Sequence, residues 1–144
     1  MHIKLFNMIV MRKLKHIFNY IFYMAYAKEE KSWASVPVLQ GLLSLSLIIN
    51  LYLLIAFILI EMFFKVPIFS LPKEELFPYI ILIATIVLII NYFIYGYKNK
   101  FAVIIDKYKT ESEENKKKNR LTTRVFIILS IVLLIIVFII GVSQ

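Results

Sequence analysis

The sequence predicts an all-α integral membrane protein: three transmembrane helices, an N-terminal amphipathic interfacial helix and a cytoplasmic extension of the second span. Of its 144 residues, 61% are hydrophobic, and the mean hydropathy is +0.82. Soluble domains contain roughly 45–50% apolar residues. Three runs, 38–64, 78–97 and 125–142, are long enough to cross a hydrocarbon core, which requires about 20 mostly apolar residues as a helix. The remaining segments are too short and too charged to bury a core of their own.

The N-terminal segment 1–37 is predicted to lie at the cytoplasmic interface. Wound as a helix, residues 10–26 separate a polar face from an apolar one at spacings of three and four. An alternative is that this helix packs beneath the spans of a neighbouring subunit. The polar face holds Arg12, Lys15, His16 and Asn19, the apolar face holds Val10, Leu14, Ile17, Phe18 and Ile21, and Tyr20, Tyr23, Tyr26 and Trp33 suit headgroup depth.

The distribution of Lys and Arg predicts the orientation. Six precede the first span, two lie between the first and second, nine lie in 98–124 and none follow. Because basic loops stay inside, the N-terminus and 98–124 are expected in the cytoplasm, with 65–77 and 143–144 outside. An A-x-A pattern at 25–27 would also fit signal-peptidase cleavage, but cleavage would place the basic loop outside. A composition rich in Ile, Lys, Asn, Phe and Tyr is typical of AT-rich coding and indicates a bacterial source, so the inner membrane is the expected location.

Two prolines organise the entry to the second span. Pro72 is expected to start a short helix with Glu74 and Glu75 in its first turn, and Pro78 is expected to open the span itself. Beyond the span, an apolar stripe recurs at three and four. A straight helix from Pro78 to Lys109 would be about 50 Å long, so the N-terminal helix, the headgroup layer after a bend near Gly96, or another subunit must cover that stripe. The stripe comprises Tyr97, Phe101, Ile104, Ile105 and Tyr108.

The segment 110–120, "TESEENKKKNR", is predicted to be a flexible solvated turn, with Thr122 or Thr123 capping the third helix. Its basic cluster has two interpretations, a topology signal or an effector-binding surface. The cluster comprises Lys116, Lys117, Lys118 and Arg120.

The first span carries polar groups on one face. Steps of three and four connect Ser46, Asn50, Leu53, Leu54, Phe57 and Glu61. The second span contains Asn91 and Thr85, whereas the third has only Ser130. The third helix is therefore expected to face lipid most, and the first two to face protein or water.

Two hypotheses account for this stripe. Asn50 and Asn91 could be interhelical hydrogen-bond partners. Alternatively, the stripe lines a pore, with a ring of Asn50, a constriction at Leu54 and Phe57, and an acidic ring of Glu61. Glu61 could instead pair with Lys65, four residues on. In the pore hypothesis, Glu74 and Glu75 belong to the outer vestibule.

The sequence lacks the residue patterns that several kinds of chemistry require. The absence of cysteine excludes disulfides and thiolate sites. His2 and His16 have no metal-binding spacing and are expected to face headgroups. No nucleophile, base or cofactor motif occurs, so neither an enzyme nor a cofactor is expected. The positive-inside pattern accounts for the net charge of +8, so no nucleic-acid duplex is expected as a partner.

The overall pattern resembles two groups of proteins. An aromatic basic N-terminus, a first span with a central Asn50 and a second span ending "NYFIYGYKNK" before "IIDKY" resemble small uncharacterised three-span bacterial membrane proteins. In size, span count and lack of enzymatic motifs, the chain is also similar to membrane effectors of phage-defence systems. That resemblance implies oligomerisation and permeabilisation of the inner membrane.

The first functional hypothesis is a homo-oligomeric inner-membrane ion channel or membrane-permeabilising effector. Its gating or assembly would involve the stripe from Phe101 to Tyr108 and the basic cluster, with a cytoplasmic ligand or protein as trigger. The lipid bilayer and its anionic headgroups are the other expected partners. The alternative is a non-conducting accessory or scaffolding subunit of a larger membrane complex.

Overall fold

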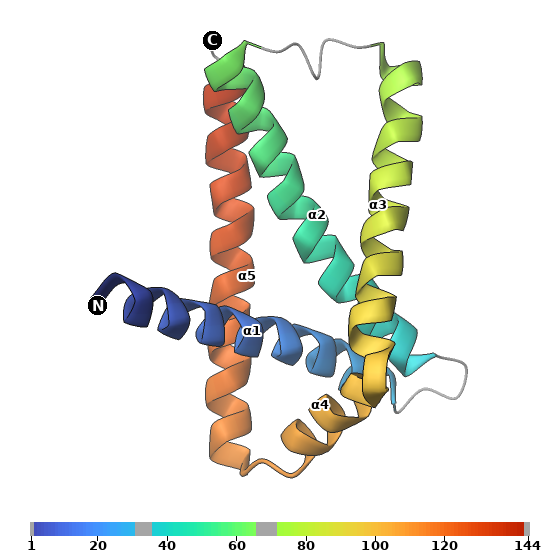
Figure 1. Cartoon of the computed structure of the whole chain (residues 1–144), viewed down its shortest axis with the longest axis vertical. Helices are drawn as coiled ribbons and strands as arrows, with labels where there is room; N and C mark the ends of the chain where they lie inside the picture. The colour runs from blue at the N-terminus through green and yellow to red at the C-terminus, as the bar shows by residue number, and fades with distance from the viewer. Residues whose placement is uncertain (1, 31–35, 66–71, 143–144) are drawn as a thin grey trace.

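The computed structural model describes residues 2–30, 36–65 and 72–142 of the chain, and Figure 1 shows their arrangement. Helix is the only regular secondary structure within these ranges. Three helical stretches are long and apolar enough to cross a membrane, which confirms the prediction of an all-α, multi-pass membrane protein. Trp33, residues 66–71 of the predicted external loop and the tail 143–144 lie outside the described residues. The elements are α1 (His2–Glu29), α2 (Pro37–Phe64), α3 (Lys73–Gly96), the 3-10 turn η1 (Tyr97–Asn99), α4 (Lys100–Lys109) and α5 (Glu113–Val142).

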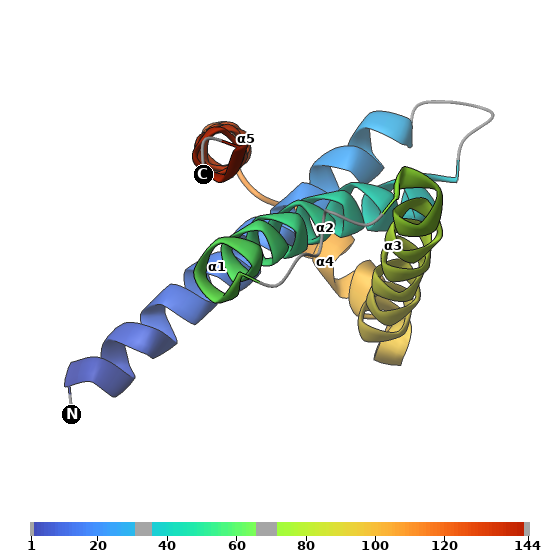
Figure 2. The same ribbon diagram turned by 90° about the horizontal axis from the view of Figure 1, so that it is seen from above.

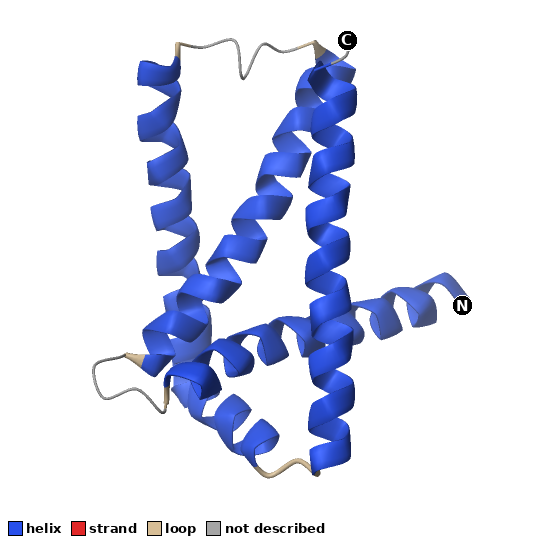
Figure 3. Cartoon of the chain, turned by 180° about the vertical axis from the view of Figure 1, so that it is seen from behind, coloured by secondary structure: helices blue, strands red, loops and turns tan. Residues whose placement is uncertain are grey.

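The α2 helix runs diagonally between α3 and α5 (Figures 1 and 3). Near its N-terminal end it packs against α3, and towards its C-terminal end Ile55 and Ile58 pack against Val137 of α5. Seen from above, α3 and α5 lie on different sides of α2 (Figure 2). The three spans therefore do not form a closed bundle: α2 and α3 diverge in one direction, and α2 and α5 in the other.

The α1 helix crosses the half of the molecule that also holds α4 and the start of α2 (Figure 1). Gly41 permits the close crossing of α1 and α2. A Cβ atom at this position would lie 2.7 Å from the Phe22 ring and 3.0 Å from the Phe22 carbonyl oxygen. Both distances are below ordinary van der Waals contact, so the crossing requires a residue without a side chain.

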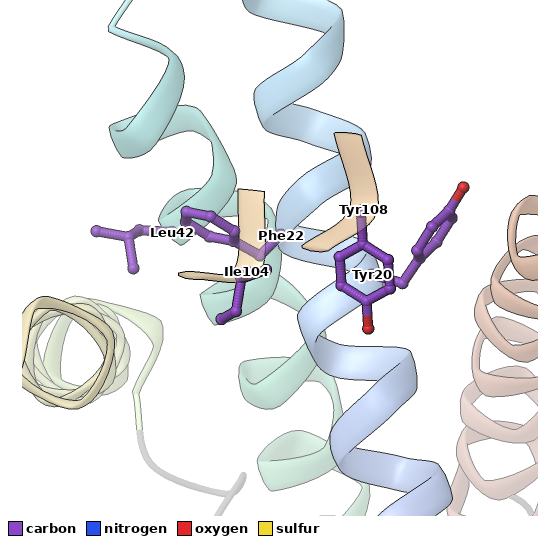
Figure 4. Packing of buried hydrophobic residues seen from close by; sticks show 5 residues of the cluster. All are labelled: Tyr20, Phe22, Leu42, Ile104 and Tyr108. Atoms are coloured by element: carbon purple, nitrogen blue, oxygen red, sulfur yellow. The ribbon is translucent and has the colours of Figure 1, made fainter. Parts of the chain in front are cut away.

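A buried cluster joins α1, α2 and α4, and Figure 4 shows its side chains close together. The rings of Tyr20 and Tyr108 meet edge to face, with their centroids 5.0 Å apart. The part of the predicted apolar stripe that lies on α4 thus packs on the N-terminal helix of the same chain, one of the three possibilities that the sequence left open, whereas Tyr97 lies in η1 and is exposed. The cluster consists of Tyr20, Phe22, Leu42, Ile104 and Tyr108, with Phe101 and Ile105 packed against it.

The second span does not continue straight to Lys109. Lys98 and Asn99 both have φ 53°, a left-handed conformation that interrupts the helix and redirects α4 towards α1. At its other end, α3 begins at Lys73 and contains Pro78, so the short helix and the span predicted separately form one helix. Since Pro78 lies in the second turn, its missing N–H removes a single hydrogen bond.

The helix that contains the third span begins before the predicted span. Helix α5 starts at Glu113, so the basic cluster is helical and the prediction of a flexible turn over 110–120 was wrong. Ser112 accepts a hydrogen bond from the Asn115 N–H at 3.3 Å, and Glu113 and Glu114 lie at the positive end of the helix. Thr123 is buried within the helix and is not its cap.

Candidate functional site

The divergence of α2 from α3 leaves an open groove, here called the α2–α3 groove. It comprises two adjoining cavities of about 340 and 550 Å³, and Asn50 lines both. Leu54 and Phe57, the predicted constriction, line the smaller cavity, and Thr85 lines the larger. The groove therefore brings together part of the polar stripe predicted on α2 with the facing surface of α3. Its other lining residues are Gln40, Leu43, Ser44, Leu47, Leu51, Leu53, Ile80, Ile81, Ile83, Ala84, Leu88 and Leu134.

Asn50 is half-buried in this groove. Its side-chain nitrogen donates to the carbonyl oxygen of Ser46, one turn earlier on the same helix, at 2.9 Å. That is its only hydrogen bond within the described part of the chain. The amide oxygen can therefore accept a hydrogen bond from a donor in the groove. Exposing this unpaired oxygen to lipid would be energetically unfavourable.

The other amide, Asn91, is buried between α3 and α2. Its nitrogen donates to the Ser46 hydroxyl oxygen at 2.9 Å, which makes it an interhelical hydrogen bond. Ser46 is likewise buried and does not face the groove in the single chain. Of the polar residues predicted to form one functional face, Ser46 and Asn91 therefore hold two helices together, whereas Asn50 is left at the open surface.

Substitution of Ser46 with alanine is expected to destabilise the α2–α3 contact by about 1 kcal/mol, because the buried Asn91 amide loses its acceptor. Thermal unfolding in detergent micelles measures the change. Combining Ser46→Ala with Asn91→Leu should cost less than the sum of the two single substitutions. Additive costs would show that the two side chains are not coupled.

The acidic residues of the predicted pore ring and of the predicted outer vestibule lie away from α1, towards the other end of the molecule (Figure 1). Glu61 is half-buried near the end of α2, while Glu74 and Glu75 are exposed in the first turn of α3. The end of α2 and the start of α3 lie at the same end of the molecule (Figure 1).

Tyr52 and Ser130 form a second interhelical contact that the sequence reasoning missed. Their side-chain oxygens are 2.6 Å apart, and because Ser130 donates to the Phe126 carbonyl, Tyr52 is the donor. In the single chain, 11% of the most apolar part of α3 and of α5 is buried against 28% for α2, and the expectation that the third helix faces lipid most stays a prediction. Ser130, the one hydroxyl in the third apolar run, was the available signal.

A hydrogen-bond network, here called the inner network, links α1, α4 and α5. The Glu111 carboxylate accepts from the Asn119 nitrogen at 2.9 Å, so the Asn119 oxygen faces His16 Nε2, 3.1 Å away. Because that oxygen can only accept, Nε2 carries a hydrogen, and in the neutral imidazole Nδ1 is then an acceptor. The Tyr108 hydroxyl lies 2.9 Å from Nδ1 and also donates to the His16 carbonyl oxygen at 3.3 Å, so these two acceptors share its single hydrogen. The expectation that His16 faces headgroups was therefore wrong.

Tyr20 adds a further link within this region. Its hydroxyl donates to the Lys116 carbonyl oxygen at 3.0 Å, which joins α1 to α5. Burial raises the pKa of the Tyr20 phenol, so the group remains a neutral donor. The Lys116 side chain pairs with Glu113 at 3.0 Å, whereas Lys117, Lys118 and Arg120 are exposed.

Within the described ranges, no three His, Cys, Asp or Glu side chains are grouped so that they could hold a metal ion. Comparisons of the chain with protein-family models, curated proteins and solved structures find no match.

Proposed function

We propose that the chain forms a homo-oligomeric pore in a bacterial inner membrane, acting as an ion channel or as a membrane-permeabilising effector. The observation that carries this proposal is Asn50, a mid-span amide that lines an open groove and whose oxygen has no partner among the described residues. A hydrated pore would solvate that oxygen, and a neighbouring subunit would fill the rest of the groove.

Self-association is central to the proposal. Three diverging helices cannot enclose a path for water, so a pore requires several copies around an axis. With the Asn50 face of α2 turned to that axis, Leu54 and Phe57 form an apolar constriction and Glu61 an acidic ring. Such a ring favours cations, and such a constriction gates by dewetting.

The inner network supplies a basis for cytoplasmic gating. It connects α1 to α4 and to the first turns of α5, and α4 follows α3 after the bend at Lys98 and Asn99. A ligand or protein that displaces α1 would release α4, and through the bend it would change the position of α3 relative to α2. The positive-inside distribution supports placing this end in the cytoplasm.

Ion flux through liposomes containing the purified full chain tests the proposal, together with the detergent-corrected mass of the same sample. Wild type is expected to be oligomeric and conducting. Asn50→Leu should reduce flux at least tenfold, because it removes the mid-span polar ring, and Glu61→Gln should lower cation selectivity. Glu114→Gln is the matched control, since it removes the same charge at the other end of the molecule and should leave selectivity unchanged.

A monomer that is silent in this assay would contradict the pore and favour the second candidate, an accessory or scaffolding subunit. The observation in favour of that candidate is the wide apolar surface of α3, where Ile80, Leu82 and Phe93 are about half or more exposed. In that case the α2–α3 groove would receive a helix of a different membrane protein.

A further inference from the structure

A pocket of about 390 Å³ opens where α1, α3 and α4 meet, and it is called here the basic pocket. Two lysines, Lys15 from α1 and Lys100 from α4, line it, and both are exposed. None of the described residues that line it is acidic. The remaining lining residues are Asn19, Ile94, Tyr95, Val103 and Ile104.

The hydrogen bonding inside the pocket favours a ligand that accepts hydrogen bonds. The Tyr95 hydroxyl donates to the Asn19 side-chain oxygen at 3.1 Å, which uses the acceptor of that amide. The Asn19 nitrogen has no hydrogen-bond partner in the described part of the chain, so its two N–H groups remain free. Together with the two ammonium groups, the nitrogen atoms of the pocket offer only donors. An anion with several oxygen atoms satisfies this arrangement.

The position of the pocket indicates that its ligand also has an apolar part. Ile94 belongs to the last turn of α3, where the apolar surface of the span ends, and Lys98 and Lys100 follow directly. The side chains of Ile90 and Ile94 are 51% and 49% exposed, and Val103 on α4 is 66% exposed. A ligand that covers these surfaces has hydrocarbon chains beside its anionic group, and it lies at the depth of lipid headgroups.

We infer that the basic pocket binds one anionic phospholipid. Its phosphate lies between Lys15, Lys100 and the Asn19 amide, and its acyl chains run along the Ile94 and Ile90 surface of α3. Basic pockets between helices at the membrane surface are suited to this recognition. The bound lipid joins α1 to α3 and α4, independently of whether the chain conducts ions.

Native mass spectrometry of the full chain in detergent tests this inference, with phosphatidylglycerol as the probe and phosphatidylcholine for comparison. Wild type should retain one phosphatidylglycerol per chain in preference to phosphatidylcholine. The double variant Lys15→Gln, Lys100→Gln should bind it about 30-fold more weakly, since each lysine near a membrane surface contributes about fivefold. The control pair Lys117→Gln, Lys118→Gln removes the same charge from exposed positions on α5 and should bind as wild type does.

Asn19→Asp provides a second test in a chain that keeps its fold. The carboxylate still accepts the Tyr95 hydroxyl, but it replaces the amide donor with a repelling charge, so phosphatidylglycerol binding should be lost. Circular dichroism checks that helicity is unchanged. Any of four results would overturn the inference: equal retention of phosphatidylcholine, an equal loss in the control pair, wild-type binding by Asn19→Asp, or displacement of the lipid by equimolar inorganic phosphate.

Discussion

Replacing Gly41 with alanine is expected to destabilise the protein by about 1–3 kcal/mol, because the added methyl group has no room at the crossing of α1 and α2. The obstacle includes the Phe22 backbone oxygen, 3.0 Å from the new Cβ, as well as the ring at 2.7 Å. Rotation of the ring relieves only part of this overlap. The helices must therefore move apart, which opens the buried cluster around Phe22 and Leu42. Thermal unfolding in detergent micelles measures the loss.

Gly96→Ala is the matched control for this prediction. A Cβ at Gly96 meets nothing within 4 Å, and the residue has φ −73° and ψ −27°, which alanine adopts readily. The control should be neutral or slightly stabilising, since alanine is the better helix former by up to about 1 kcal/mol. If Gly41→Ala unfolds at the same temperature as Gly96→Ala, α1 does not pack closely on α2.

Truncation of Tyr108 to alanine should have the largest effect, a loss of about 3–5 kcal/mol, as for other large buried aromatic residues. The side chain is fully buried, its ring contacts Tyr20, and its hydroxyl lies 2.9 Å from His16 Nδ1. The change in unfolding midpoint, measured in the same micelles, gives the size of the loss.

Two further variants separate packing from hydrogen bonding. Tyr108→Phe keeps the ring but leaves His16 Nδ1 without its donor, so it should cost about 1–3 kcal/mol. Tyr97→Ala truncates a tyrosine that is 61% exposed at the bend and should change stability little. Equal effects of Tyr108→Ala and Tyr97→Ala would mean that α4 does not pack against α1.

The spans were predictable because the hydrophobic requirement of a bilayer acts on each segment separately. The predicted first span, 38–64, matches α2 to within one residue, and the end of the third matches that of α5. The start of α5 was missed because the charged segment "EENKKKNR" suits solvent as a turn or as an exposed helix. The cap at Ser112 and the two acidic residues in the first turn favour the helix.

The contacts of the candidate site depend on how the helices pack against one another, which the periodicity of the sequence does not reveal. The stripe on α2 was a correct grouping along one helix, but the tilt of α2 separates its members, burying Ser46 against Asn91 and leaving Asn50 in the open groove. His16 was read as surface-facing because its helix has basic neighbours. Its partners, Tyr108 and Asn119, come from segments about a hundred residues away, and only the bend at Lys98 and Asn99 brings α4 back to it.

The contact between His16 and Tyr108 also has a consequence for biogenesis. These residues are 92 positions apart, so at a synthesis rate of about 5–20 residues per second the ribosome makes Tyr108 roughly 5–20 s after His16. During that interval the tyrosine-rich face of α1 has no α4 to cover it. The membrane surface is the nearest apolar environment available to this face. Helix α1 would therefore bind lipid first, and would exchange that lipid for protein only when translation has passed the second span.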